Sequence, residues 1–463
     1  MDGAPLTNMQ TRDVEALLHP YTNAVQHRKV GPHIIERGEG VYVYDDQGRR
    51  FIEGMAGLWC AGLGFGDAEL IEAAREQLGR LPYYHLFGGR SHEPAIELAE
   101  RIKALTPVPM SKVFYQSSGS EANESQVKMA WYYNNARGKP EKKKIISRVK
   151  GYHGVTIVSA SMTGLPYNHR HFDLPVDRIK HVSTPHHWRH AEPGESERDF
   201  SARLAAELDA FIEAEGPDTV AAFIAEPVMG AGGVITPPEG YFEAVMPVLR
   251  KHDVLMIDDE VICGFARTGS WFGAETFGME PSSMSMAKQL TASYVPLSAV
   301  AINAEMADAI EALTGEVGVF GHGFTYGGHP LGCAVACKTL EIYERRDILG
   351  HVRQVSPRLQ QKLRSFAEHP LVGEARGVGL LGALELSPDK AQAAAFAEPG
   401  KVGPRLAQEL LKHGVILRAI GDVVAICPPM VITEDEIDAL FAPMETALDA
   451  TLAWAQAEGR MAA

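Results

Sequence analysis

One lysine, Lys288, lies inside an uncharged run of small and apolar residues, "SMAKQLTASYVPLSAV", at positions 285–300. A lysine is almost never fully buried unless its ammonium has a partner. Desolvation lowers the pKa of a lysine and favours a neutral, nucleophilic amine. Lys288 is therefore the first candidate for a catalytic residue.

The stretch "FYQSSGSEANESQVK" could bind an anion. An apolar, strand-like run ends in Ser117, Ser118, Gly119 and Ser120, and a helical pattern begins at Glu121. Small residues at a helix N-terminus present backbone N–H groups and the positive end of the helix dipole to a phosphate. A plain helix cap fits the same residues equally well. The P-loop pattern G-x-x-x-x-G-K-[ST] does not occur in the sequence.

Acidic residues follow two other apolar runs. Asp258, Asp259 and Glu260 end "VLMIDDE", and Glu226 ends "AAFIAE" before a glycine-rich loop. Because adjacent residues of a strand point to opposite faces, at most two of the first three acids share a face. Such acids could bind a metal, hold a protonated ring nitrogen or cap the next loop.

These three groups together suggest one cofactor. Ligands of open α/β sheets bind beyond the carboxyl ends of the strands, where these residues are expected. Pyridoxal 5′-phosphate requires a phosphate site, an acid for its pyridinium nitrogen and a lysine that forms a Schiff base. The residue types therefore favour this cofactor.

The composition is that of an ordinary soluble globular protein, and its charge favours metabolite chemistry. The chain has 463 residues, of which 45% are hydrophobic and 22% charged, and its net charge is −15 at pH 7. This charge argues against binding to nucleic acid or to an anionic membrane surface. We find no basic-then-apolar leader and no run of 18 apolar residues, and the five cysteines have no regular spacing. We therefore expect free thiols and a cytoplasmic protein.

Two other clusters suggest metal binding less strongly. Cys333 and Cys337 lie one helical turn apart, but no second pair follows them, so buried thiols are favoured. His186, His187 and His190 lack an adjoining acid, which favours a surface loop. We expect no metal site.

Alternating strands and helices must position the candidate residues. Apolar runs alternate with helical patterns from residue 68 to 331, which predicts a mostly parallel sheet flanked by helices. Residues 332–463 contain two long helical patterns and then short strands, which indicates a smaller α+β domain. A predicted hairpin at 41–52, with its turn at 45–48, lies in the N-terminal part (residues 1–67), which could join that smaller domain. The predicted ligand site is the cleft between the two domains.

The chain resembles the class III (subgroup II) pyridoxal-phosphate-dependent aminotransferases. The motifs that carry the resemblance are "SGSEANESQVK", "GYHG", "AEPVMGAGG", "DDEVICGFARTG", "MAKQL" and "HGFTYGGHPLGCA". Within the family, "GLWCAGLGFG", "LFGGRSHE" and "GVILRAIGD" look most like the amine:pyruvate (S)-ω-transaminases. The resemblance covers nearly the whole chain and implies a fold type I α/β transferase and a homodimer with shared active sites, which could pair into a tetramer.

The resemblance also implies roles for individual residues. Lys288 would carry the cofactor and move the proton, and Asp259 would pair with the pyridinium nitrogen. The other implied cofactor contacts are Ser118, Gly119 and Ser120 at the phosphate, Thr325 from the partner subunit, Tyr152 and Val261 on the two ring faces, His153, and Glu226 near the hydroxyl edge. The implied substrate contacts are Leu58, Trp59, Phe87, Tyr152, Ala231, Phe324 from the partner, and Arg418 as a mobile carboxylate binder.

The predicted reaction is transamination from a primary amine or amino acid to a keto acid such as pyruvate. It would be ping-pong, through the pyridoxamine form of the cofactor. A decarboxylase or aminomutase of the same fold is the alternative, and a non-catalytic relative is a third. The arginine match and the aromatic pocket favour transfer.

Overall fold

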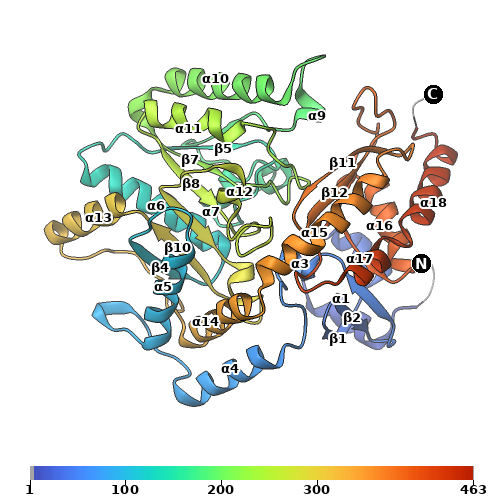
Figure 1. Ribbon diagram of the computed structural model, residues 1–463, viewed down its shortest axis with the longest axis horizontal. Coiled ribbons are helices and arrows are strands. Elements are labelled where there is room, and N and C mark those ends of the chain that lie inside the picture. Colours follow the sequence, from blue (N-terminus) through green and yellow to red (C-terminus); the bar gives the residue numbers. More distant parts are fainter. Residues whose placement is uncertain (1–4, 462–463) are drawn as a thin grey trace.

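The computed structural model describes residues 5–461 and contains one large, central sheet (Figure 1). In spatial order its strands are β4 (Lys112–Gln116), β10 (Ser298–Ile302), β9 (Ser283–Met286), β8 (Leu255–Asp259), β7 (Val220–Ala225), β5 (Lys144–Arg148) and β6 (Ile179–Val182). All run in one direction except β10, which is antiparallel to both of its neighbours. The predicted mostly parallel α/β sheet is confirmed.

Helices cover both faces of this sheet, which is why its central strands are apolar throughout. Every residue of β7, β9 and β10 is buried. Helices α10 (Glu197–Glu215) and α11 (Tyr241–Lys251) pack together over the sheet, and α6 (Gly119–Ala136) packs against β9 and β10 (Figure 1). The other helical segments of this part are α4 (Ala68–Arg80), η1 (Phe87–Gly89), α5 (Glu93–Leu105), α7 (Ile157–Met162), α8 (Pro166–His169), α9 (His187–His190), η2 (Pro217–Thr219), α12 (Gly273–Phe277), η3 (Lys288–Thr291), α13 (Ala304–Val317) and α14 (Pro330–Arg345).

The two ends of the chain meet in the smaller part of the molecule. The predicted hairpin is confirmed as β2 (Tyr42–Asp45) and β3 (Arg50–Glu53), and β3 pairs in parallel with β13 (Val415–Ile416) near the other end. The first sheet there is completed by β1 (Ile35–Glu39), and the second contains β11 (Val372–Val378), β12 (Leu381–Leu386), β15 (Val423–Ile426) and β14 (Arg418–Ile420). The remaining helices are α1 (Asn8–Ala16), α2 (Ala24–Val30), α3 (Ala56–Trp59), α15 (Ile348–Ser365), α16 (Val402–Lys412), α17 (Glu434–Phe441) and α18 (Met444–Ala457).

The division into domains at 67/68 and 331/332 stays a prediction. The sharing of a sheet by β3 and β13 agrees with an N-terminal contribution to the smaller domain. The second boundary falls inside α14, whose first residue is Pro330. Within residues 5–461, none of the helices combines the length and apolarity needed to span a bilayer.

Candidate active site

The site forms where five parallel strands end at one edge of the central sheet. The segments that follow β4, β5, β7, β8 and β9 all leave the sheet at this edge, because β10 alone is reversed. They lead, respectively, to the start of α6, to Tyr152, to Glu226, to Val261 and to Lys288. Residues scattered over 170 positions are thereby brought together, as expected for an open α/β sheet.

A cavity of about 210 Å³ lies at this edge and contains most of the predicted site. Twelve predicted residues line it: Leu58, Trp59, Gly119, Ser120, Tyr152, His153, Glu226, Ala231, Asp259, Val261, Lys288 and Arg418. The cavity walls come from both parts of the molecule, since Arg418 belongs to β14. The predicted location between two domains is consistent with this arrangement.

Lys288 is held in an unusual backbone conformation. It is the first residue of η3, directly after β9, and its φ is +42°. A non-glycine residue rarely adopts positive φ, and such strain concentrates at functional sites. Among the described residues its amine has no hydrogen-bond or ion-pair partner, and burial lowers the pKa of Lys288, although Cys60 and Asp259 oppose the shift. The amine is therefore unpartnered, and its burial favours the neutral form over the charged one.

Asp259 ends β8 and is 4% exposed. Its Oδ2 accepts hydrogen bonds from Asn123 Nδ2 at 2.7 Å and from the His153 ring nitrogen Nδ1 at 2.8 Å, and its Oδ1 accepts one from the Val261 N–H at 3.2 Å. Asn123 is itself fixed, because it also donates to the His153 carbonyl and accepts from Ser285. Several donors thus hold a buried carboxylate that faces the cavity, which keeps its position and offsets its desolvation.

The neighbouring acids point away, as strand alternation predicts. Asp258 and Glu260 do not line the cavity, and Glu260 accepts a hydrogen bond from the Ala274 N–H at 2.7 Å. Burial, and then Glu260, raises the pKa of Asp258 well above its usual range. Of the three acids, Asp259 is therefore the one that faces the cavity.

The N-terminus of α6 offers free N–H groups to the cavity. Ser118 caps the helix: its hydroxyl accepts the Glu121 N–H at 3.2 Å and its carbonyl accepts the Ala122 N–H. The N–H groups of Gly119 and Ser120 have no partner among the described residues. A Cβ atom at Gly119 would come within 3.1 Å of the Val261 side chain, so a larger residue there would require Val261 to shift. Ser118 itself does not line the cavity, and its hydroxyl serves the cap.

Glu226 and Tyr152 form a connected wall. The fully buried Glu226 carboxylate accepts the N–H groups of Tyr152 at 2.9 Å and Gly230 at 3.0 Å. Burial raises the pKa of Glu226, and it also raises the pKa of the Tyr152 hydroxyl. The backbone donors to Glu226 fix the loop that carries Tyr152.

These groups suit the cofactor that the sequence favours. An unpartnered, desolvated lysine amine, a buried carboxylate and two free N–H groups at the start of an 18-residue helix line the same cavity. They match an aldehyde, a protonated ring nitrogen and a phosphate, respectively. The residues present therefore fit pyridoxal phosphate.

Three predicted residues lie elsewhere on this chain. Phe87 and Phe324 line a separate surface cavity, and Thr325 is exposed, with its carbonyl accepting the Tyr83 hydroxyl at 2.8 Å. None of the three lines the cofactor cavity. This separation is compatible with the expectation that Phe324 and Thr325 serve a partner's site, whereas Phe87, expected in this chain's own pocket, lies outside it.

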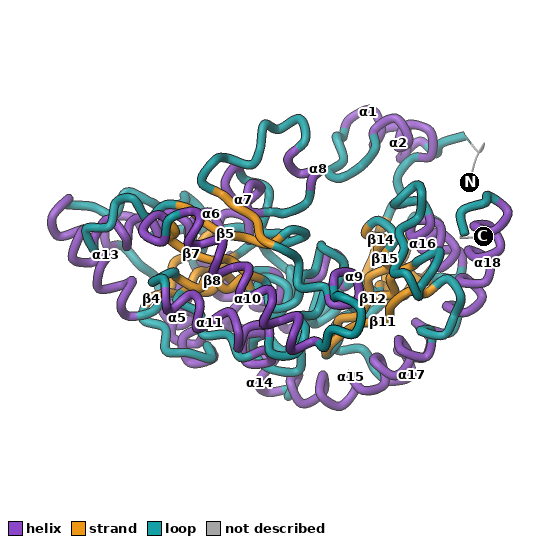
Figure 2. The backbone as a smooth tube through the Cα atoms, turned by 90° about the horizontal axis from the view of Figure 1, so that it is seen from above, coloured by secondary structure: helices purple, strands orange, loops and turns teal. Residues whose placement is uncertain are grey.

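Sequence reasoning missed several residues of the cavity. Tyr21, Asn123 and Tyr167 line it, and Tyr21 arrives on the segment between α1 and α2. In Figure 2 these two helices lie across from α8, over the gap between the two parts of the chain. A buried polar face on α6, with Asn123 and Gln126 one turn apart, was a usable signal. Nothing near Tyr21 in the sequence indicated its place.

The expected surface loop at His186 is wrong. His186 is 2% exposed, and its Nε2 lies 2.8 Å from the Glu374 carboxylate in the smaller part of the molecule. Arg376 also pairs with Glu374, and it pairs with Glu385 at 2.6 Å. The acidic partners are 188 or more residues away in the chain, so no local pattern could reveal them.

Comparison with known proteins gives one consistent family. Residues 23–448 match the family model described as aminotransferase class-III. The chain is 47% identical over 436 residues to gamma-aminobutyrate transaminase 1, mitochondrial, of Oryza sativa subsp. japonica, which covers 94% of this chain and 84% of that one. It superposes with a TM-score of 0.95 and 53% identity on a thermostable omega transaminase 4-fold mutant from Pseudomonas jessenii, over 97% of this chain and 99% of that one. The omega transaminase of that organism in complex with PMP gives the same values.

Proposed function

The chain belongs to the class-III aminotransferases, and from this premise we propose that it transfers amino groups from primary amines and amino acids to pyruvate. The protein is a pyridoxal-phosphate-dependent aminotransferase of fold type I, as the sequence predicted. The matched proteins give no support to the alternative of a decarboxylase or aminomutase. The resemblance to omega transaminases supports amines as donors, and the resemblance to gamma-aminobutyrate transaminases supports ω-amino acids.

One observation carries the proposed site: Lys288, Asp259 and the start of α6 line a single cavity. In the proposal Gly119 and Ser120 hold the phosphate, and Thr325 of a second copy completes that contact. Asp259 would accept a hydrogen bond from the pyridinium N–H, and Asn123 and His153 fix its position. Tyr152 and Val261 border the two ring faces, and Glu226 fixes the Tyr152 loop.

When bound, pyridoxal phosphate supplies an aldehyde that exchanges amines and a ring that withdraws electrons from the substrate carbon. Lys288 would hold the cofactor through its amine. Its Nζ would then be the base that moves a proton between the substrate carbon and the cofactor, and burial lowers its pKa in the direction that this role requires. Asp259, held by hydrogen bonds from Asn123, His153 and the Val261 N–H, would face the ring nitrogen.

The substrate walls divide into apolar and charged parts. Leu58, Trp59 and Ala231 suit the hydrocarbon of an amine, and Arg418 suits the carboxylate of pyruvate. Among the described residues Arg418 makes no ion pair or hydrogen bond, so its guanidinium is free for a ligand. Alternation between the two substrates then depends on whether Arg418 has a carboxylate to bind.

The proposal includes a homodimer. Phe87 and Phe324 border a surface cavity of about 1070 Å³, and Phe87 is 51% exposed. An exposed aromatic surface of this kind favours burial against another chain. A second copy seated there would add Phe87, Phe324 and Thr325 to the neighbouring cofactor cavity, and two dimers could pair further. The five free cysteines support a reducing compartment, and we propose the cytoplasm.

The test is turnover of 1-phenylethylamine with pyruvate by the protein loaded with pyridoxal phosphate. We expect acetophenone and alanine in equal amounts. Release of carbon dioxide from an amino-acid donor without formation of alanine would contradict transamination. Size-exclusion chromatography with light scattering tests the dimer, and a monomer with full activity would contradict the shared site.

A further inference from the structure

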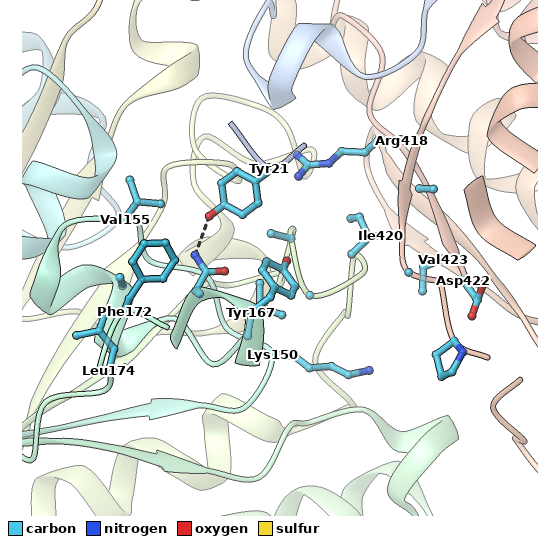
Figure 3. A pocket seen from close by; sticks show the side chains of 18 of the residues that line it. Tyr21, Lys150, Val155, Tyr167, Phe172, Leu174, Arg418, Ile420, Asp422 and Val423 are labelled. Atoms are coloured by element: carbon cyan, nitrogen blue, oxygen red, sulfur yellow. Dashed lines mark hydrogen bonds between the residues drawn. The ribbon is translucent and has the colours of Figure 1, made fainter. Parts of the chain in front are cut away.

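A second, larger cavity of about 1430 Å³ adjoins the cofactor cavity. Tyr21, Tyr167, Ala231 and Arg418 line both cavities, so a molecule can extend from one into the other. The Tyr21 hydroxyl accepts a hydrogen bond from Asn168 Nδ2 at 2.7 Å and lies between the two spaces (Figure 3). We call this larger space the outer cavity.

Apolar residues line two sides of the outer cavity. In Figure 3 Val155, Phe172 and Leu174 gather on one side, and Ile420 and Val423, from the smaller part of the molecule, form an apolar wall on the other. Apolar surface removed from water stabilises a complex by roughly 25 cal/mol per Å². An alkyl chain attached to a bound amine would therefore gain from following this wall.

A single lysine projects into the same space. Lys150 lies between β5 and Tyr152 with φ +67°, and its ammonium points into the outer cavity in Figure 3. It does not line the cofactor cavity. Among the described residues it makes no ion pair and no side-chain hydrogen bond. Burial lowers the pKa of Lys150, although Glu385 opposes the shift, so the ammonium lacks a partner of its own.

Two acids that line the outer cavity, Glu385 and Asp422, are engaged by other groups. Glu385 is paired with Arg189 at 2.6 Å and with Arg376 at 2.6 Å. The Asp422 carboxylate accepts the N–H groups of Gly400, Val402 and Gly403 at the start of α16. Because Glu385 binds two cations and Asp422 binds the start of α16, the Lys150 ammonium has no ion-pair partner among the described residues, which favours an incoming anion.

Arg418 and Lys150 occupy different sides of this space. Arg418 comes from β14 and points toward Tyr21, whereas Lys150 projects from the opposite side in Figure 3. Arg418 lines both cavities and can meet a carboxylate close to the reacting carbon. Lys150 can meet only an acid at the far end of a longer molecule.

We propose that Lys150 forms a distal carboxylate subsite, which selects amine donors that carry an acid at the far end of an alkyl chain. The amine reacts at Lys288, the chain follows the apolar wall, and the terminal carboxylate pairs with Lys150. This inference rests on the proposed function and names a donor class for it: ω-amino acids too long for Arg418 to hold.

The first experiment compares Lys150→Met with wild type on matched donors. Straight-chain ω-amino acids of three to nine carbons are each paired with the n-alkylamine of equal length, with pyruvate as acceptor. For the longer members, we expect the ratio of kcat/KM for the acid over that for the alkylamine to fall at least about tenfold in Lys150→Met. Lys150→Arg, which keeps the charge, should restore most of this ratio, and Lys251→Met at the exposed end of α11 is the matched control.

A ratio unchanged by Lys150→Met at every chain length would overturn the proposal. A ratio that falls equally for the three-carbon and nine-carbon donors would also overturn it, because a short acid cannot reach the outer cavity and the reaction centre together. The proposed function fails separately, if wild type forms no alanine from 1-phenylethylamine and pyruvate.

Equilibrium binding gives a readout that does not depend on turnover. Suberate, a straight dicarboxylate, can present one acid to Arg418 and the other to Lys150 in the protein loaded with cofactor. By calorimetry we expect its Kd to rise at least about tenfold in Lys150→Met and to recover in Lys150→Arg. An unchanged Kd in Lys150→Met would overturn the subsite even if turnover failed for another reason.

Discussion

The two adjoining cavities differ in how their charged side chains are held. In the cofactor cavity Asp259 has three hydrogen-bond donors, and Asn123 and Glu226 are equally fixed by their neighbours. In the outer cavity Arg418 and Lys150 have no ion pair among the residues that the structure describes. Fully bonded groups hold one geometry, whereas unpartnered cations can accept ligands of different length.

This difference indicates a division of labour. The reaction requires a lysine, an acid and a phosphate site at fixed relative positions, and the ends of parallel strands supply that rigidity. Substrate choice requires side chains that bind one ligand and make no contact with another. Arg418 lines both cavities, so it can contribute to the reaction and to substrate choice. The following changes test whether reaction and selection can be separated.

The largest effect should come from Lys288→Ala. The change removes the only amine in the cofactor cavity that can move the proton, so we expect kcat to fall on the order of 10⁴-fold or more for every donor. Stopped-flow and steady-state assays measure this loss, and Lys251→Ala is the control. Turnover within tenfold of wild type would contradict the assigned role of Lys288 and with it the separation of the two cavities.

Residue type alone predicted Lys288 and the group of acids at 258–260, and the family resemblance singled out Asp259. Lys288 and Asp259 belong to uncharged or apolar runs that end at strand termini, where a charge needs a reason. The supports of Asp259 were harder to predict, because Asn123 contacts it across 136 positions. The phosphate site was predicted as a region, but Ser118 proved to be engaged in helix capping.

Chain direction and long-range contacts limited the prediction of the fold. The sequence "SAVAI" of β10 is as apolar as that of a parallel strand, so its reversed direction leaves no local mark. Strands β6 and β9 are only four residues long and were missed for that reason. The outer cavity depends on contacts between Tyr21, the α7–α8 region and β14, which no periodicity encodes.

Arg418→Ala should have a smaller and more selective effect. Loss of a bidentate partner for a carboxylate costs about 2–5 kcal/mol, so kcat/KM for pyruvate should fall roughly 10²-fold. In single-turnover half-reactions, the step with pyruvate should slow at least about tenfold more than the step with 1-phenylethylamine. Equal slowing of both steps would show that Arg418 supports the cavity rather than a carboxylate.

The smallest effect concerns the ion pairs that Glu385 forms with Arg376 and Arg189 beside the outer cavity. Burial alone would raise the pKa of Glu385, but Arg376, His186 and Arg189 outweigh it and lower the pKa to about 2. The lowered pKa means that the carboxylate stabilises the fold above its unfolded pKa near 4.5 and loses this contribution as the pH falls toward 2. The shift corresponds to about 3 kcal/mol at neutral pH.

Glu385→Gln should therefore lower the melting temperature of the protein at pH 7 by roughly 3–6 °C. The difference from wild type should shrink by about two fifths at pH 3.5, because the unfolded chain is then protonated and part of the wild-type advantage is lost. Scanning fluorimetry from pH 7 to 3.5 measures both, with Glu36→Gln on the exposed edge of β1 as the control. A melting-temperature difference that stays constant from pH 7 to 3.5 would mean that Glu385 acts through its shape and hydrogen bonds and not through its charge. Charged groups with fixed partners would then matter only in the cofactor cavity.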